Sequence, residues 1–107
     1  MIKPTVGRKV WYRPSQQDKD GLADTPQRME ANNDEPLDAT VIAVWGDRCV
    51  NLAIFDIYGT LHARRSVTLL QDGDIRPAGG RLAEWMPYQQ AQAAKVPTGD
   101  VPQEPHA

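Results

Sequence analysis

Residues 37 to 70 constrain the fold of this chain more than any other segment. They contain three β-rich runs, Leu37–Trp45, Cys49–Phe55 and Leu61–Leu70. Gly46-Asp47-Arg48 between the first two is a connection of hairpin length. Asp56-Ile57-Tyr58-Gly59 between the second and third is a tight turn, in which glycine can supply a positive φ. The sequence therefore predicts a three-stranded antiparallel meander.

Two shorter runs flank this meander. Residues 7–13, GRKVWYR, combine aromatic and β-branched types and stop at Pro14, and residues 81–88 form a last short run. Five short strands with tight turns are typical of a mainly β fold, a small five-stranded SH3-like barrel or a curved antiparallel sheet. We expect the barrel, because closure removes the exposed edges of the sheet.

The connections define the expected domain organisation. Residues 15–35 are polar and form a long first loop, in which we expect one helical turn over Pro26–Ala31 with Thr25 as N-cap. Residues 89–107 begin with helix formers and become Pro-rich, which predicts a short helical turn and a disordered, flexible C-terminal tail. The prediction is thus a single small β domain over 1–88 and a tail over 89–107.

Alternation within the strands predicts which side chains face the core. Val50, Leu52 and Ile54 share one aliphatic face, which we expect to point inward. In the third run of the meander, alternation sorts the residues into an inward and an outward set. Arg65 interrupts the inward, apolar set and therefore needs a partner such as Asp38 or Glu84. The set expected inward is Leu61, Ala63, Val67 and Leu69, and the set expected outward is His62, Arg64, Ser66 and Thr68.

Composition excludes several classes of function. The formal net charge of −2 argues against a protein that coats nucleic acid, so nucleic acid is an unlikely partner. Cys49 is the only cysteine, so no intrachain disulfide or cysteine-cluster zinc site can form, and we expect a reducing, cytoplasmic environment. No window approaches the ~20 apolar residues of a membrane helix. The sequence shows no catalytic set and no metal-ligand spacing, so we expect no cofactor, no metal and no enzymatic activity.

Three segments resemble small uncharacterised proteins encoded by tailed bacteriophages and prophages. They are KPTVGRKVWY (residues 3–12), VNLAIFDIYGT (50–60) and AEWMPY (83–88). The resemblance implies a phage or prophage origin, and it transfers no catalytic or binding residue to this chain. If it holds, the expected location is the host cytoplasm, or the virion if the protein is a structural component.

Aromatic residues recur beside arginines in or near the predicted strands. Aromatic faces can stack on bases and guanidinium groups can bind phosphate bidentately, so the pairing suits a nucleotide or a single nucleic-acid strand. Tryptophan and arginine also anchor protein interfaces, and in so small a domain at least one tryptophan belongs in the core. The candidate ligand-binding residues are Trp11, Arg13, Trp45, Arg48, Arg81 and Trp85.

These observations support functions of different classes. The first is a non-catalytic phage accessory protein of the host-takeover or anti-defence kind, which binds and sequesters a small nucleotide signal or a host protein. The alternative is a virion structural protein, such as a head-decoration or tail component, and a weaker alternative is a nucleic-acid-binding barrel. Three tryptophans in so small a domain also predict a homo-oligomer with at least one of them at the subunit contact.

Overall fold

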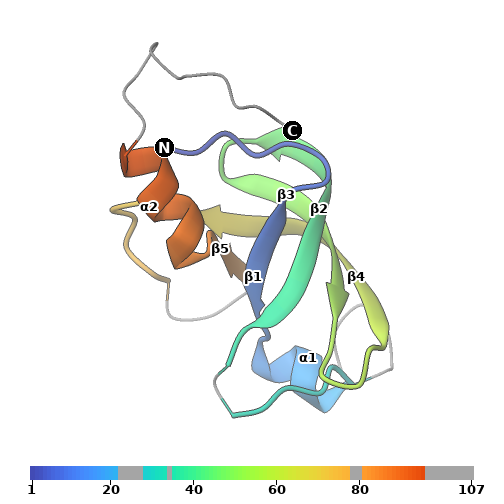
Figure 1. Ribbon diagram of the computed structural model, residues 1–107. Helices are drawn as coiled ribbons and strands as arrows, with labels where there is room; N and C mark the ends of the chain where they lie inside the picture. The colour runs from blue at the N-terminus through green and yellow to red at the C-terminus, as the bar shows by residue number, and fades with distance from the viewer. Residues whose placement is uncertain (22–27, 34, 78–80, 96–107) are drawn as a thin grey trace, which may run out of the picture.

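The chain folds into one closed β-barrel with two short helices (Figure 1). The computed structural model describes residues 1–21, 28–33, 35–77 and 81–95. The elements are β1 (Lys9–Arg13), α1 (Gln16–Asp20), β2 (Leu37–Gly46), β3 (Cys49–Phe55), β4 (Leu61–Leu70), β5 (Leu82–Glu84) and α2 (Pro87–Lys95). Within the described ranges, no helix is long and apolar enough to span a membrane.

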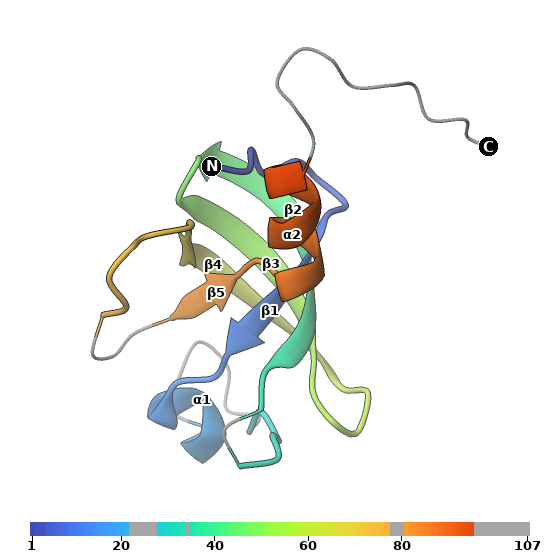
Figure 2. The same cartoon turned by 60° about the vertical axis from the view of Figure 1, so that its left-hand side comes forward.

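The strands are neighbours in chain order, and the last one closes the barrel. Strands β1 to β4 form an antiparallel series, β5 pairs antiparallel with β1, and β4 pairs with β5 in parallel. The predicted five-stranded barrel and its meander are therefore confirmed. Figure 2 shows that α1 and α2 lie toward opposite ends of this barrel.

The helices differ from the sequence-based expectations. Helix α1 begins inside the predicted loop, where Ser15 and Asp18 form a capping box and Gly21, at φ 77°, ends the helix. The helical turn expected over 26–31 lies partly outside the described residues, and residues 28–31 are not helical. The last predicted strand, 81–88, is only three residues long because Pro87, which has no N–H to donate to a strand ladder, starts α2.

The barrel interior contains the aliphatic face predicted for β3. Val50, Leu52 and Ile54 are fully buried, and Met29 from the first loop belongs to the same buried cluster. The other buried apolar side chains of this core are Val10, Tyr12, Leu37, Ala39, Val41, Val67, Leu69, Ala83 and Trp85.

The predicted orientation of the first half of β4 is wrong. His62 and Arg64 are only 3% and 1% exposed, whereas Leu61 is 56% exposed and Ala63 also faces solvent. The cause is a bulge, in which Arg65 and Ser66 together oppose Asn51, and Ser66 adopts a φ of 54°. One extra residue reverses the alternation, so only Val67 and Leu69 point inward as expected.

The buried Arg64 anchors α1 to the barrel. Its Nε donates to Asp18 Oδ1 at 2.8 Å, and Asp18 also accepts hydrogen bonds from the Tyr12 hydroxyl and the Ser15 amide. Burial acts to raise the pKa of Asp18, but these hydrogen bonds outweigh it and lower that pKa below its usual value. The Arg64 side chain therefore has its counter-charge in α1, and the exposed Arg65 does not carry the ion pair expected for it.

A second buried carboxylate, Asp56, closes the turn between β3 and β4. It accepts hydrogen bonds from the amides of Tyr58 and Thr60 and from His62 Nε2 at 3.0 Å, and more weakly from the amide of Glu30. Burial acts to raise the pKa of Asp56, but these bonds lower it overall. Asp56 thus joins the first loop to the β3–β4 turn.

Acid should destabilise the folded protein through these carboxylates. Because the folded-state pKa values of Asp18 and Asp56 lie below the unfolded value of about 4, their contribution is complete above that pH. This stabilising contribution is lost as the pH falls through the folded-state pKa values of the two carboxylates. We expect thermal unfolding followed by circular dichroism to give a constant midpoint above about pH 5 and a falling midpoint below about pH 4. An Asp56→Asn variant should show a shallower fall, and a wild-type midpoint that is unchanged at pH 3 would contradict this account.

Candidate functional site

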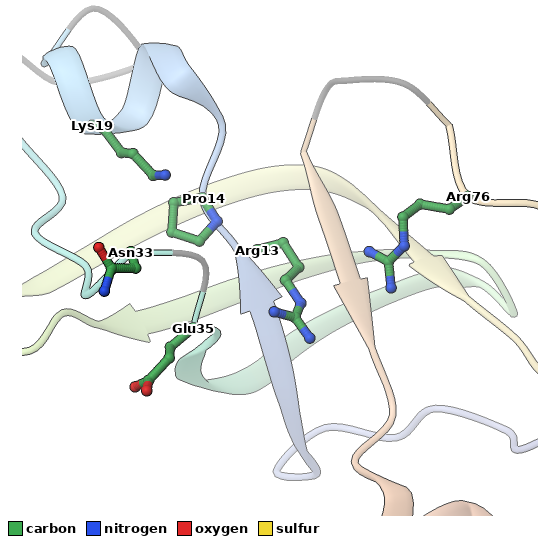
Figure 3. A pocket seen from close by; sticks show the side chains of 6 residues that line it. All are labelled: Arg13, Pro14, Lys19, Asn33, Glu35 and Arg76. Carbon is green, nitrogen blue, oxygen red and sulfur yellow. The ribbon is translucent and has the colours of Figure 1, made fainter.

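A pocket opens beside α1 where three separate segments meet β1 (Figure 3). Its volume of about 380 Å³ falls within the range of small-molecule sites. The lining residues come from the end of β1 and the residue after it, from α1, from the segment before β2 and from the β4–β5 connection. They are Arg13, Pro14, Lys19, Asn33, Glu35 and Arg76.

One carboxylate organises the two arginines of this pocket. Arg13 approaches Glu84 Oε2 with Nε at 2.8 Å and Nη2 at 2.7 Å, and Arg76 Nη2 donates to Glu84 Oε1 at 2.6 Å. Burial acts to raise the pKa of Glu84, but the hydrogen bonds and charges of the two arginines hold it below its usual value. Glu84 is therefore ionised at neutral pH and holds both guanidinium groups, whose side chains line the pocket.

Lys19 adds a third positive charge from the opposite wall. Its side chain extends from α1 toward Pro14 (Figure 3), and its Nζ has no hydrogen bond or ion pair within the described part of the chain. The neighbouring Asp18 fixes α1 on the barrel, so the position of Lys19 depends on that buried contact. The pocket thus has three cationic side chains, and the carboxylates nearby are those of Glu35 and Glu84. The net charge of this group is +1, which favours an anionic ligand.

Trp11 provides a flat surface next to this charged group. It is half-buried on β1 opposite Glu84, and the Arg13 guanidinium lies 5.8 Å from its ring centroid. Two of the predicted ligand-binding residues are thus brought together: Arg13 lines the pocket, and Trp11 lies beside Arg13. Asn33 and Glu35 add hydrogen-bonding groups on the other side.

None of the other predicted residues lines this pocket. Trp45 is 66% exposed, donates to Asn51 and lies at the far end of β2, and Arg48 is held bidentately by Asp74. Arg81 contacts the backbone carbonyl of Arg65. Trp45 and Arg48 thus lie apart from Arg13, whereas Arg81 precedes Leu82, the β5 residue that pairs with Arg13.

Trp85 belongs to the core. This agrees with the expectation that at least one tryptophan packs inside the domain. It is 2% exposed, and its indole N–H donates to Gln71 Oε1 at 3.2 Å. The Gln71 amide also bonds to both backbone groups of Ile2 and to the carbonyl of Asp47. Trp85 therefore helps to fix the N-terminal segment and offers no free face to a ligand.

Sequence reasoning missed Lys19, Asn33, Glu35, Arg76 and Glu84 at the site. The search for aromatic–arginine pairs could not find them, because four of them have no aromatic neighbour in the chain and Glu84, which precedes Trp85, is not an arginine. One local signal was available, because the Ser15-x-x-Asp18 capping box predicts the helix that presents Lys19. Arg76 and Glu84 come together with Arg13 only through the pairing of β1 with β5.

The described residues contain no group of three or more His, Cys, Asp or Glu side chains that could hold a metal ion. The pocket is lined by charged and amide side chains and by Pro14. Comparison with protein-family models, curated proteins and solved structures finds no match to this chain. The phage resemblance of residues 3–88 stays a prediction from sequence.

Proposed function

We propose that the protein is a non-catalytic binding protein whose pocket captures a small phosphate-bearing ligand, with a nucleotide as the first candidate. The convergence of Arg13, Lys19 and Arg76 on one pocket of about 380 Å³ carries the proposal. Guanidinium groups bind phosphate oxygens through charge-assisted hydrogen bonds, and a lysine adds a mobile point charge. Trp11 lies beside Arg13, where a nucleobase could stack.

The proposed role in the cell is sequestration. A binding protein without catalytic groups lowers the free concentration of its ligand, which fits a host-takeover or anti-defence factor acting in the host cytoplasm. This role depends on the phage resemblance, whereas the binding proposal depends only on the pocket.

Removing one cation should weaken phosphate binding without unfolding the barrel. Each of Arg13→Ala, Lys19→Ala and Arg76→Ala should raise the dissociation constant roughly ten- to a hundredfold, equivalent to about 1.5 to 3 kcal/mol for a charge-assisted contact. Arg13→Lys should bind at an intermediate level, because it keeps the charge and loses the planar fork. The measurement is calorimetric titration with linear and cyclic nucleotides and inorganic phosphate.

Lys3→Ala is the matched control for loss of a surface charge. Lys3 is highly exposed and interacts with Asp47 at the opposite end of the barrel, so its removal should change affinity less than about threefold. Wild-type protein that binds none of these ligands more tightly than millimolar would contradict the proposal.

A virion accessory protein is the second candidate, and the apolar exterior of the meander favours it. Trp45, Phe55, Ile57, Tyr58 and Leu61 are all substantially exposed, and large exposed apolar surfaces are typical of protein contacts. Mass spectrometry of purified particles separates the two functions. Abundant copies in virions would support the structural role and contradict sequestration.

A further inference from the structure

The outer face of β2, β3 and β4 carries an apolar surface that is independent of the phosphate pocket. Phe55 and Leu61 are directly opposite each other on β3 and β4, and both side chains point to solvent. The next outward pair along the same strands is Ala53 and Ala63. A row of large side chains thus lies beside a row of small ones, which we call the ridge (Phe55, Leu61) and the furrow (Ala53, Ala63).

The closed barrel limits how this surface can be covered. Strand β3 is paired along its whole length with β2 on one side and with β4 on the other, so it has no edge available for sheet extension. A partner that covers the β3 side chains of this surface therefore packs face to face, as sheets do at a separation of about 10 Å. A surface that covers itself in a closed dimer must be complementary to itself under a two-fold rotation.

The ridge and the furrow meet this condition. Consider a two-fold axis in the plane of the contact, perpendicular to the strands and midway between the ridge and the furrow. Rotation about this axis places the ridge of each copy in the furrow of the other. The same rotation brings the next level of one copy, with Trp45 and Asn51, over the β3–β4 turn of the other, with Ile57 and Tyr58. Trp45 is already fixed over this face by its hydrogen bond to Asn51 at 2.9 Å.

Charges at the two ends of the face match in the same arrangement. Arg65 lies opposite Asn51 at one end, is exposed, and its guanidinium has no ion pair within the described part of the chain. Glu30 lies at the other end, where its carbonyl accepts the Ile57 amide, and its exposed carboxylate is equally unpaired among those residues. The two-fold rotation brings Arg65 of each copy toward the partner's Glu30.

We propose that this face is the contact of a symmetric homodimer, with the ridge of each subunit in the furrow of the other and with Arg65 facing Glu30 across the contact. The phosphate pocket lies between α1, β1 and the β4–β5 connection and is lined by none of these residues. The dimer therefore leaves the pocket open, and its test does not depend on ligand binding.

Sedimentation equilibrium of the full chain, from low micromolar to near-millimolar concentration, tests the proposal. Wild type should dimerise, and Ala63→Arg, which fills the furrow with an unpaired charge, should raise the dimer dissociation constant at least tenfold. Ile75→Arg is the matched control, because Ile75 is a highly exposed apolar residue in the β4–β5 connection and lies outside the contact. It should dimerise like wild type. Leu61→Ser provides a second disruption should Ala63→Arg fail to fold.

Charge exchange tests the predicted pairing directly. Arg65→Glu alone and Glu30→Arg alone should each weaken the dimer severalfold, and the double variant should recover most of the loss. A strictly monomeric wild type would overturn the proposal and leave the face to a different protein. A dimer that survives both Ala63→Arg and Leu61→Ser would overturn it by placing the contact elsewhere.

Discussion

Replacing Asp18 with asparagine should destabilise the protein by about 3 to 5 kcal/mol, as expected when one partner of a fully buried ion pair is removed. The Arg64 guanidinium and the Asp18 carboxylate have no exposed surface, and Arg64 Nη2 already has no hydrogen-bond partner among the described residues. The variant leaves a buried cation without its counter-charge. Urea unfolding of wild type and variant measures the loss directly.

An exposed ion pair provides the control for this prediction. Asp38 Oδ2 lies 3.1 Å from Lys9 Nζ, and both side chains are about half exposed. Asp38→Asn should therefore lower the free energy of unfolding by less than about 1 kcal/mol. A double variant, Asp18→Leu with Arg64→Met, removes both buried charges and should be more stable than Asp18→Asn alone. Equal losses in Asp18→Asn and Asp38→Asn would show that Asp18 does not anchor α1.

Leu52→Ala should cost about 2 to 5 kcal/mol, because Leu52 is fully buried in the centre of β3 and its truncation leaves a cavity. Leu61→Ala removes the same atoms from an exposed position on β4 and should cost less than about 1 kcal/mol in dilute solution. Thermal and urea unfolding of the two variants compare them under identical conditions. Similar losses at both positions would mean that the first half of β4 faces inward after all.

The sequence pattern predicts the orientation of Leu52 correctly and that of Leu61 incorrectly. Alternation is a local property, so the inward face of β3 could be predicted from Val50, Leu52 and Ile54 alone. In β4 the bulge at Arg65 and Ser66 inserts one residue. Arg65 interrupts the apolar alternation at this position, but one charged residue does not distinguish a bulge from a buried ion pair. Arg64 becomes an inward residue because Asp18, 46 positions earlier, supplies the charge that makes its burial tolerable.

The pocket was predictable only in part for the same reason. Trp11 and Arg13 are two residues apart on one strand, so their common side of β1 follows from the sequence. Arg76 and Lys19 reach the pocket from a connection and a short helix, and their placement depends on barrel closure and on the Asp18 anchor. Pairing of tryptophan with arginine along the chain also suggested Arg48 and Arg81, neither of which lines the pocket.

The most direct test of the phosphate-binding proposal is an NMR titration of ¹⁵N-labelled protein with a nucleotide panel. The three indole N–H signals report on three different environments, since Trp11 lies beside Arg13, Trp45 lies on the meander exterior and Trp85 lies in the core. We predict saturable shifts of the Trp11 indole and of the Arg13, Lys19 and Arg76 amides, with the Trp45 and Trp85 indoles unchanged. Shifts confined to Trp45 and its neighbours, or no saturable shift with any nucleotide, would contradict the assignment of this pocket as a phosphate site.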